Sequence, residues 1–329
     1  MNKEPLIQIY GCGGCGTNIV QNKLEVPRHA QYGKTSVVAI DTSDANYDAD
    51  KGVPFYRIPG TEGMGRKRGF ALDVAEDKID DILKRHKPGS MNVIIASAGG
   101  GSGSVIGLLL AKEFMRRSIP FVVQLVASST SQLDAQNSHG TMLSFQKAVN
   151  ETGKVLPVMY YENIDGSSQR DGDGNRDQVD AVLVKDLLTL IFTCSEQHKA
   201  LDRQDVTNWL DYPSVTKIEP KLVEVKVFRH GEEITDLAKF LDNQVISTIS
   251  LLHETSHSTP AIHQAYEKTG YMNDDAKDIE QNLTWTVSSV HITSYASGLK
   301  TSVEEHKRVA SELNAVSGLN LDDEDEDIL

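Results

Sequence analysis

Two glycine-rich segments constrain the fold of this 329-residue chain more than any other feature of its sequence. The first, residues 11–18, reads Gly-Cys-Gly-Gly-Cys-Gly-Thr-Asn and follows the apolar run 6–10. The second, residues 98–104, reads Ala-Gly-Gly-Gly-Ser-Gly-Ser and follows the apolar run 92–96. A helical pattern comes after each of them. A strand, a glycine turn and a helix N-terminus form a phosphate cradle, because glycine lets backbone N–H groups approach an anion and the helix dipole attracts it.

Apolar runs alternate with helical patterns along the first half of the chain. Further apolar runs lie at 36–40 and 120–127, and helical patterns lie at 71–87 and 104–115. Continuous apolar strands that alternate with helices predict a Rossmann-like parallel sheet with helices on both faces. The chain is therefore predicted to be an α/β protein.

The pattern changes after residue 166. A loop at 166–177 is rich in Gly, Ser, Asp and Arg, and a long apolar helix at about 178–198 follows it, which predicts a buried central helix. Beyond Pro213, half-buried strands predict a second, smaller α+β domain. The expected strands are 221–228, 244–252 and 283–293, and a last helix is expected at 299–316.

Composition excludes several classes of function. A net charge of −14 disfavours direct binding to nucleic acid, because phosphate contacts need Lys and Arg. No run reaches the roughly 18 apolar residues of a membrane span, and the N-terminus lacks the pattern of a signal peptide. Cys12, Cys15 and Cys194 do not make a disulfide framework. We expect a cytoplasmic protein that contacts neither nucleic acid nor membrane directly.

The first glycine segment is also compatible with a dinucleotide site. Its spacing from Gly11 to Gly16 is Gly-x-Gly-x-x-Gly, and Asp41 ends the next expected strand, where a ribose-binding acid belongs. An NAD-dependent oxidoreductase is therefore an alternative. A redox pair formed by Cys12 and Cys15 is a weaker one, because small residues are tolerated in a glycine run whose spacing already has a use.

A zinc-protease motif offers a second alternative class. Residues 253–257 read His-Glu-Thr-Ser-His, and His263 follows. The chemistry requires the first two histidines on one helix face, whereas the preceding run 245–252 alternates as a strand does. Pro260 replaces the glycine that turns the chain toward the third ligand. We interpret this match as coincidental.

The second glycine segment resembles the tubulin/FtsZ signature, a glycine triplet followed by Ser/Thr-Gly-Ser/Thr. The first is similar to the first nucleotide loop of FtsZ. No Gly-Lys-Ser/Thr of a Walker loop is present, so backbone amides must supply most of the field around the phosphates. The resemblance covers most of residues 6–210 and implies that GTP or GDP is bound, with Mg²⁺ coordinated mainly through phosphates and water. The nucleotide-binding positions that it implies are Gly11, Gly13, Gly14, Cys15, Asn18, Gly65, Ala98, Gly99, Gly100, Gly101, Ser102, Gly103, Ser104, Asn163 and Asp180.

Some of these positions have particular roles in the family. Asp180 falls where the family reads the guanine edge, since a carboxylate accepts from N1–H and N2–H₂ together; a surface acid on a helix is the plain alternative. Asn163 resembles the asparagine that contacts the nucleoside. Where the family has an aromatic residue that stacks on the base, this chain has Arg176 at or near that position, and arginine can also stack. Gly65 opens a basic turn where the γ-phosphate loop should be. The ribose-binding Glu and Arg of the family are not found, and Asn137 is the candidate in their place.

Asp202 and Asp205 follow the expected central helix. In one interpretation, Asp205 is only the N-cap of a helix at 205–210. The pair also resembles the FtsZ catalytic loop, whose two acids enter the nucleotide site of the next subunit. There they position water and a cation for attack on the γ-phosphate. The resemblance implies a GTPase activated by polymerisation, because the site is complete only between subunits stacked head to tail.

Within the superfamily, the chain lacks the long linker and apolar tail peptide of FtsZ and is shorter than eukaryotic tubulins. Its acidic end, residues 322–329, makes it most like the phage tubulins of the PhuZ type. Those form filaments in an infected bacterium, position the phage DNA compartment and carry capsids, and their acidic tail binds the neighbouring subunit. The runner-up is a plasmid-partitioning tubulin of the TubZ type, which uses a DNA-bound adaptor. The expected parts are a GTP-binding domain at 1–177, the central helix at 178–200, a second domain at 201–297, and a C-terminal helix with the acidic tail at 298–329.

Overall fold

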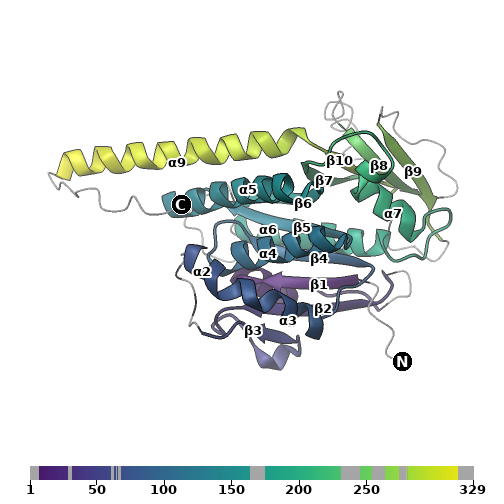
Figure 1. The fold of residues 1–329 in the computed structure, drawn as a ribbon, viewed down its shortest axis with the longest axis horizontal. Coiled ribbons are helices and arrows are strands. Elements are labelled where there is room, and N and C mark those ends of the chain that lie inside the picture. The colour runs from purple at the N-terminus through teal and green to yellow at the C-terminus, as the bar shows by residue number, and fades with distance from the viewer. Residues whose placement is uncertain are drawn as a thin grey trace.

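A single twisted sheet runs through the part of the chain that the computed structural model describes (Figure 1). Its strand order is β3-β2-β1-β4-β5-β6-β7-β10-β8-β9. The described residues are 7–28, 32–60, 63, 65, 68–163, 175–230, 245–253, 264–273, 279 and 281–317.

The first six strands of the sheet are parallel. Their order, 3-2-1-4-5-6, is that of a doubly wound nucleotide-binding fold, which confirms the predicted Rossmann-like parallel sheet. The carboxyl ends of these strands share one edge of the sheet, where such folds bind their ligands. The strands are β1 (Ile7–Cys12), β2 (Thr35–Asp41), β3 (Phe55–Arg57), β4 (Met91–Ser97), β5 (Phe121–Ser128) and β6 (Leu156–Asn163).

The remaining four strands extend the same sheet. β7 joins β6 in parallel, β10 lies antiparallel between β7 and β8, and β9 forms the parallel edge. The sheet is thus continuous across the boundary expected at 178–200, and the division into domains there stays a prediction. The bounds are β7 (Leu222–Arg229), β8 (Val245–Leu252), β9 (Tyr266–Tyr271) and β10 (Leu283–Ser288).

Helices cover both faces and bury two apolar clusters. One cluster contains Leu183, Leu187 and Leu190 of α6, and the other contains apolar residues of α4 and α5. No helix in the described ranges is long and apolar enough to cross a lipid bilayer. The helices are α1 (Gly13–Asn18), α2 (Arg68–Ala75), α3 (Ile79–Arg85), α4 (Ser102–Arg117), α5 (Gln132–Thr152), α6 (Asn175–Thr193), α7 (Arg203–Leu210) and α9 (Val290–Ser317), with a π-helical turn η1 (Ile19–Lys23) and 3-10 turns η3 (Ala49–Lys51), η4 (Glu76–Lys78) and η5 (Tyr212–Ser214).

The C-terminal helix α9 packs along α5 and projects beyond it (Figure 1). Near its start, the ring of Tyr295 stacks on that of Tyr160 with 4.0 Å between centroids, and its hydroxyl donates to Glu224 at 2.7 Å. Farther along, His306 Nε2 lies 2.9 Å from the carbonyl oxygen of Ser129. These contacts fix the helix on the sheet domain.

Several expected elements differ from the structure. The last helix, expected at 299–316, is α9 and begins much earlier, at Val290. The strand expected at 283–293 ends at Ser288, where the pairing of β10 with β8 shifts register, and α9 begins at Val290. The helix expected at 71–87 is divided into α2 and α3 by a 3-10 turn. The central helix ends at Thr193 rather than at 198, because Glu196 adopts a left-handed φ of 60° that no α-helix accommodates.

Candidate functional site

The two glycine segments meet at the carboxyl edge of the parallel strands. Gly13 has a φ of +67°, and a Cβ there would lie 2.6 Å from Cα of Gly103. A Cβ on Gly103 would in turn lie 2.7 Å from the carbonyl oxygen of Cys12. Real Cβ atoms do not approach other atoms this closely, so each loop requires glycine because the other loop touches it.

The first turn is also tight within itself. A Cβ on Gly11 would lie 2.6 Å from the carbonyl oxygen of Gly16, and one on Gly16 would lie 2.5 Å from that of Ile95 on β4. Helix α1 therefore starts directly against the sheet. Its N-terminus lies at the carboxyl edge of the sheet, and the free N–H groups of a helix N-terminus attract anions.

An open cavity of about 750 Å³ lies over the two loops, and we name it the cradle cavity. Its volume falls in the range of roughly 300–1,000 Å³ that small-molecule and cofactor sites occupy. Its lining residues come from the carboxyl ends of β1 and β4, from α1, η1 and α6, from the segment after β2 and from the second glycine segment. They are Cys12, Gly14, Cys15, Asn18, Asn22, Lys23, Asn46, Ser97, Gly100, Gly101, Ser102, Gly103 and Asp180.

Side-chain hydrogen bonds hold the second glycine segment in place. Ser104 Oγ donates to the carbonyl oxygen of Gly100 at 2.6 Å, and Asn137 Nδ2 donates to that of Gly99 at 3.2 Å. Thus Ser104 and Gly99 lie behind the cradle cavity and shape it. Asn137, the candidate for a ribose contact, braces the loop in this structure.

Asp41 also braces this segment. Its side chain is buried, its Oδ1 accepts from the backbone N–H of Thr42 at 2.7 Å, and the hydroxyl of Thr42 donates to Ser102 Oγ at 3.0 Å. Burial raises the pKa of Asp41, and the hydrogen bonds oppose that shift. The acid that the dinucleotide alternative required is therefore turned into the protein, where it supports the second glycine segment.

A π-helical turn, η1, extends α1 and lines the cradle cavity with residues that the sequence analysis did not identify. Asn22 and Lys23 both lie on it, and Asn22 Nδ2 donates to Asn18 Oδ1 at 3.0 Å. π-Helical turns are rare and often occur at functional sites. Asn46 enters the cavity from the segment after β2 and approaches Gly14 closely.

Of the other positions predicted to bind nucleotide, one lines the cradle cavity and two do not. Asp180 is 5% exposed and lines the cradle cavity from the second turn of α6. Asn163 ends β6, and its Oδ1 is buried without a hydrogen-bond partner among the described residues. Gly65 is exposed with a φ of +50°, and Gly65 and Asn163 are both outside the cavity lining that the described residues form. The side chain of Arg176 lies outside the described part of the chain.

Asp202 and Asp205 form a reciprocal capping box at the start of α7. Asp202 Oδ1 accepts from the backbone N–H of Asp205 at 3.0 Å, and Asp205 Oδ2 accepts from that of Asp202 at 3.1 Å. The expectation that Asp205 is the N-cap was wrong: the helix begins at Arg203 and Asp202 caps it, since its backbone is extended and its carboxylate reaches the N3 amide.

These acids and the cradle cavity lie at opposite ends of β4. Ser97, at the carboxyl end of the strand, lines the cradle cavity. Met91, at its amino end, lines a small crevice together with Asp202. The strand has seven residues, which corresponds to about 20 Å at the usual rise per residue. Within one chain, the acids are therefore a full strand length from the loops.

Comparison with known proteins shows what the chain is similar to. Residues 201–292 match the model described as phage tubulin-like protein, C-terminal domain. A phage tubulin-like protein of Pseudomonas phage PhiPA3 is 24% identical over 302 residues, which cover 91% of this chain and 89% of that relative. The chain is therefore similar to phage tubulin-like proteins over most of its length.

Solved structures of phage tubulins share the whole fold of this tubulin-like chain. A protofilament of TubZ from bacteriophage PhiKZ superposes with a TM-score of 0.81 at 22% identity. The phage tubulin PhuZ with GDP superposes with a TM-score of 0.82 at 21% identity. Each covers 99% of this chain and 96% of the solved chain. The tubulin fold thus extends over both halves of the sheet.

The family match falls where the motifs of the sequence were weakest. The glycine segments lie before residue 105, whereas the matched region begins at Leu201 and contains the acid pair and β7 to β10. The family model and the glycine segments thus concern different parts of the tubulin-like chain.

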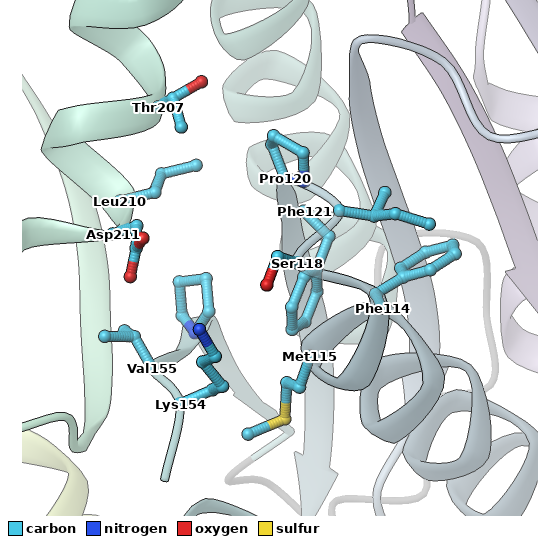
Figure 2. Close-up of a pocket in the computed structure, with 12 residues that line it drawn as sticks. Phe114, Met115, Ser118, Pro120, Phe121, Lys154, Val155, Thr207, Leu210 and Asp211 are labelled. Carbon is cyan, nitrogen blue, oxygen red and sulfur yellow. The ribbon is translucent and has the colours of Figure 1, made fainter. Parts of the chain in front are cut away.

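A second cavity, of about 70 Å³, lies at the amino edge of the sheet (Figure 2). Thr207 and Leu210 of α7 line one side of it, and Phe114 and Met115 of α4 line the other. Burial raises the pKa of Asp211 at its rim. This cavity is mainly apolar and contains none of the residues predicted to bind nucleotide.

Among the described residues around His253, the structure does not have the helix that a zinc-protease motif requires. His253 follows directly on β8 and is not in a helix, and its Nε2 lies 2.9 Å from the carbonyl oxygen of Ile279. The other residues of the motif, 254–263, lie outside the described residues. Within the described ranges, no three His, Cys, Asp or Glu side chains gather as a metal site would require.

Proposed function

We propose that this chain is a GTP-binding and GTP-hydrolysing filament protein whose subunits stack head to tail. The observation that carries the proposal is the separation of the cradle cavity from Asp202 and Asp205 by the length of β4. Stacking one chain on another brings the amino edge of one sheet to the carboxyl edge of the next. Such a contact joins two different surfaces and does not close on itself, so filaments result.

In this proposal the cradle cavity holds GTP or GDP. Backbone N–H groups of Gly13 to Cys15 and of Gly100 to Gly103 surround the phosphates, because glycines leave them accessible. Asp180 reads the guanine edge, and Asn18 and Asn163 contact the nucleoside. Gly65 belongs to the loop beside the γ-phosphate. Mg²⁺, held mainly by phosphates and water, offsets the phosphate charge when bound.

The acids act on the nucleotide of the neighbouring subunit. The oxygen of a water molecule bonds to the γ-phosphorus, the bond from that phosphorus to the bridging oxygen breaks, and GDP leaves with the electron pair. The water proton passes to solvent. Asp202, which is exposed, and Asp205, which is held by it, orient the water for in-line attack. Positioning and charge stabilisation are the main contributions that a protein makes to phosphoryl transfer.

The biological role follows from the phage tubulins that the chain resembles. We infer that it forms cytomotive filaments in the cytoplasm of an infected bacterium, where they position the phage DNA compartment and move capsids, directly or through an adaptor. The acidic tail, residues 322–329, contacts the neighbouring subunit in the filament. This tail lies outside the described residues.

The proposal is tested by light scattering and phosphate release on the purified protein given GTP, ATP or NADH. We expect GTP alone to raise scattering and to release phosphate. An Asp205→Ala variant should still assemble and should release phosphate at least tenfold more slowly, because the neighbour's nucleotide loses a positioned carboxylate.

The control variant is Asp73→Ala, which removes an exposed carboxylate on α2. It should assemble and hydrolyse as the wild-type chain does. If GTP produces neither scattering nor phosphate over a wide range of protein concentration, the filament GTPase is excluded, and binding of NADH would return the first glycine segment to the dinucleotide class.

A further inference from the structure

One face of the edge strand β9 is occupied by the segment that carries the two acids. Side chains alternate along a strand, so Tyr266, Lys268 and Gly270 share a face. All three contact the segment 199–205, which we name the acid loop. A Cβ on Gly270 would lie 2.5 Å from Cβ of Leu201, so glycine is needed there for the loop to approach the strand.

The backbone of β9 also fixes the start of the acid loop. The N–H of Lys199 donates to the carbonyl oxygen of Tyr271 at 2.9 Å, and the N–H of Tyr271 donates to that of Lys199 at 2.8 Å. Ala200, the next residue, has a left-handed φ of 60°. The loop is therefore held at both ends, by a backbone bridge at Lys199 and by the capping box at Asp202.

Two side chains of β9 hold the carboxylate of Asp205. Lys268 Nζ lies 3.2 Å from Asp205 Oδ2, and the hydroxyl of Tyr266 donates to Oδ1 at 3.3 Å. The same Oδ2 accepts the backbone N–H of Asp202 at 3.1 Å. Both oxygens are thus engaged, and the plane of the carboxylate is set.

The pair formed by Lys268 and Asp205 stands at the boundary between the protein and solvent. The side chain of Asp205 is 16% exposed and that of Lys268 is 39% exposed. Lys268 therefore remains accessible to a molecule that docks on this end of the sheet. Two carboxylates that approach a polyphosphate repel it, and the repulsion grows as docking excludes water. A lysine on Asp205 offsets one of the two negative charges.

We propose that Lys268 is a positioning residue of the site formed between two subunits. It sets the orientation of the Asp205 carboxylate and offsets its charge, so that the acid loop can approach the phosphates on the next subunit. This inference rests on the proposed function. Nothing in the spacing of residues 266–271 indicates the role, because it arises from the packing of β9 against the acid loop.

Two substitutions separate charge from shape. Lys268→Met keeps an unbranched side chain of similar length and removes the charge, and Lys268→Arg keeps the charge. The matched control is Lys147→Met, since Lys147 lies 3.9 Å from Glu151 and Lys112 keeps that carboxylate paired at 2.9 Å. Phosphate release at saturating GTP is measured per mass of sedimented polymer, beside the critical concentration and the thermal unfolding midpoint.

We expect Lys268→Met to lower phosphate release per polymer by about tenfold to a hundredfold and to raise the critical concentration, because a displaced catalytic group loses rate on that scale. Lys268→Arg should restore most of the rate, and Lys147→Met should match the wild type. The unfolding midpoints should agree, which excludes a general loss of structure.

Asp205→Ala, measured in parallel, separates the role of Lys268 from the proposed function. If Asp205→Ala is defective and Lys268→Met hydrolyses as the wild type does, the role of Lys268 is refuted while the proposed function stands. Equal defects in Lys268→Met and Lys268→Arg would also refute it, since the charge would then not matter. If Asp205→Ala itself hydrolyses normally, Asp205 is not catalytic and the role of Lys268 is refuted with it, whereas the filament GTPase still stands on GTP-dependent assembly and phosphate release.

Discussion

Replacing Gly13 by alanine tests whether contact between the two glycine segments builds the nucleotide site. Gly13 has a φ of +67°, and an added Cβ would lie 2.6 Å from both Cα and N of Gly103. A left-handed conformation costs a residue with a Cβ about 1–2 kcal/mol. Relieving such a contact in a packed region costs about 1–3 kcal/mol more. The two effects together predict a loss of about 2–5 kcal/mol, from stability or from the geometry of the cavity.

Gly153→Ala is the matched control. Gly153 follows α5 with a φ of +61°, and nothing lies within 4 Å of its added Cβ. This variant should lose only the cost of the left-handed conformation, about 1–2 kcal/mol, and should bind GTP as the wild type does. The difference between the two variants therefore isolates the contact of Gly13 with Gly103.

The assay is titration of a fluorescent GTP analogue, together with urea unfolding of both variants. For Gly13→Ala we expect the affinity for GTP to fall by more than about tenfold, since about 1.4 kcal/mol of distortion at the cradle is enough for that change. Equal loss of stability in both variants, with GTP affinity unchanged, would show that the two loops can separate freely and would refute the reasoning.

Two further predictions concern the tail and a buried histidine. Deletion of residues 320–329 should abolish assembly, measured by sedimentation, and leave the affinity for GTP unchanged; normal polymer from the truncated chain would exclude a role for the tail. Burial lowers the pKa of His198, whose Nε2 lies 2.7 Å from the carbonyl oxygen of Phe192 and whose Nδ1 is buried without a partner among the described residues. Below about pH 6.5 the unfolded chain binds a proton at His198 that the folded chain does not, so the stability of the protein should decrease as the pH is lowered. In His198→Gln, the decrease in the urea midpoint between about pH 7.5 and 5 should therefore be smaller.

Sequence reasoning was strongest where a local pattern has a single physical use. Four glycines within residues 11–16, after an apolar strand, can hardly serve anything but a close backbone approach, and the structure shows that approach at Gly13. The parallel sheet followed from continuous apolar runs, since strands buried on both faces cannot alternate. Most expected strands agree with the structure to within a residue or two at each end.

Prediction from the sequence was weaker where the same pattern is compatible with more than one kind of element. The alternation at 283–293 is typical of a strand, yet β10 ends at Ser288, since its pairing with β8 ends there. Helix α5 and strand β6 were also not among the expected elements. The polar residues of α5 hide its buried stripe, whose members, such as Met142 and Phe145, are apparent only once the sheet is placed beneath it.

In the candidate site too, features set by neighbouring residues in the chain were predicted, and contacts between distant segments were not. The sequence alone determined that two glycine cradles lie on a parallel sheet and that an acid pair follows the central helix, because these depend on backbone freedom and on residues close in the chain. The tertiary structure decided which residues line the cradle cavity, that Asp41 faces inward, and that Lys268 holds Asp205 from 63 positions away. It also set the cradle cavity and the acids at opposite ends of β4. Contacts of this kind arise from packing between distant segments, which leaves no periodic trace in the order of residues.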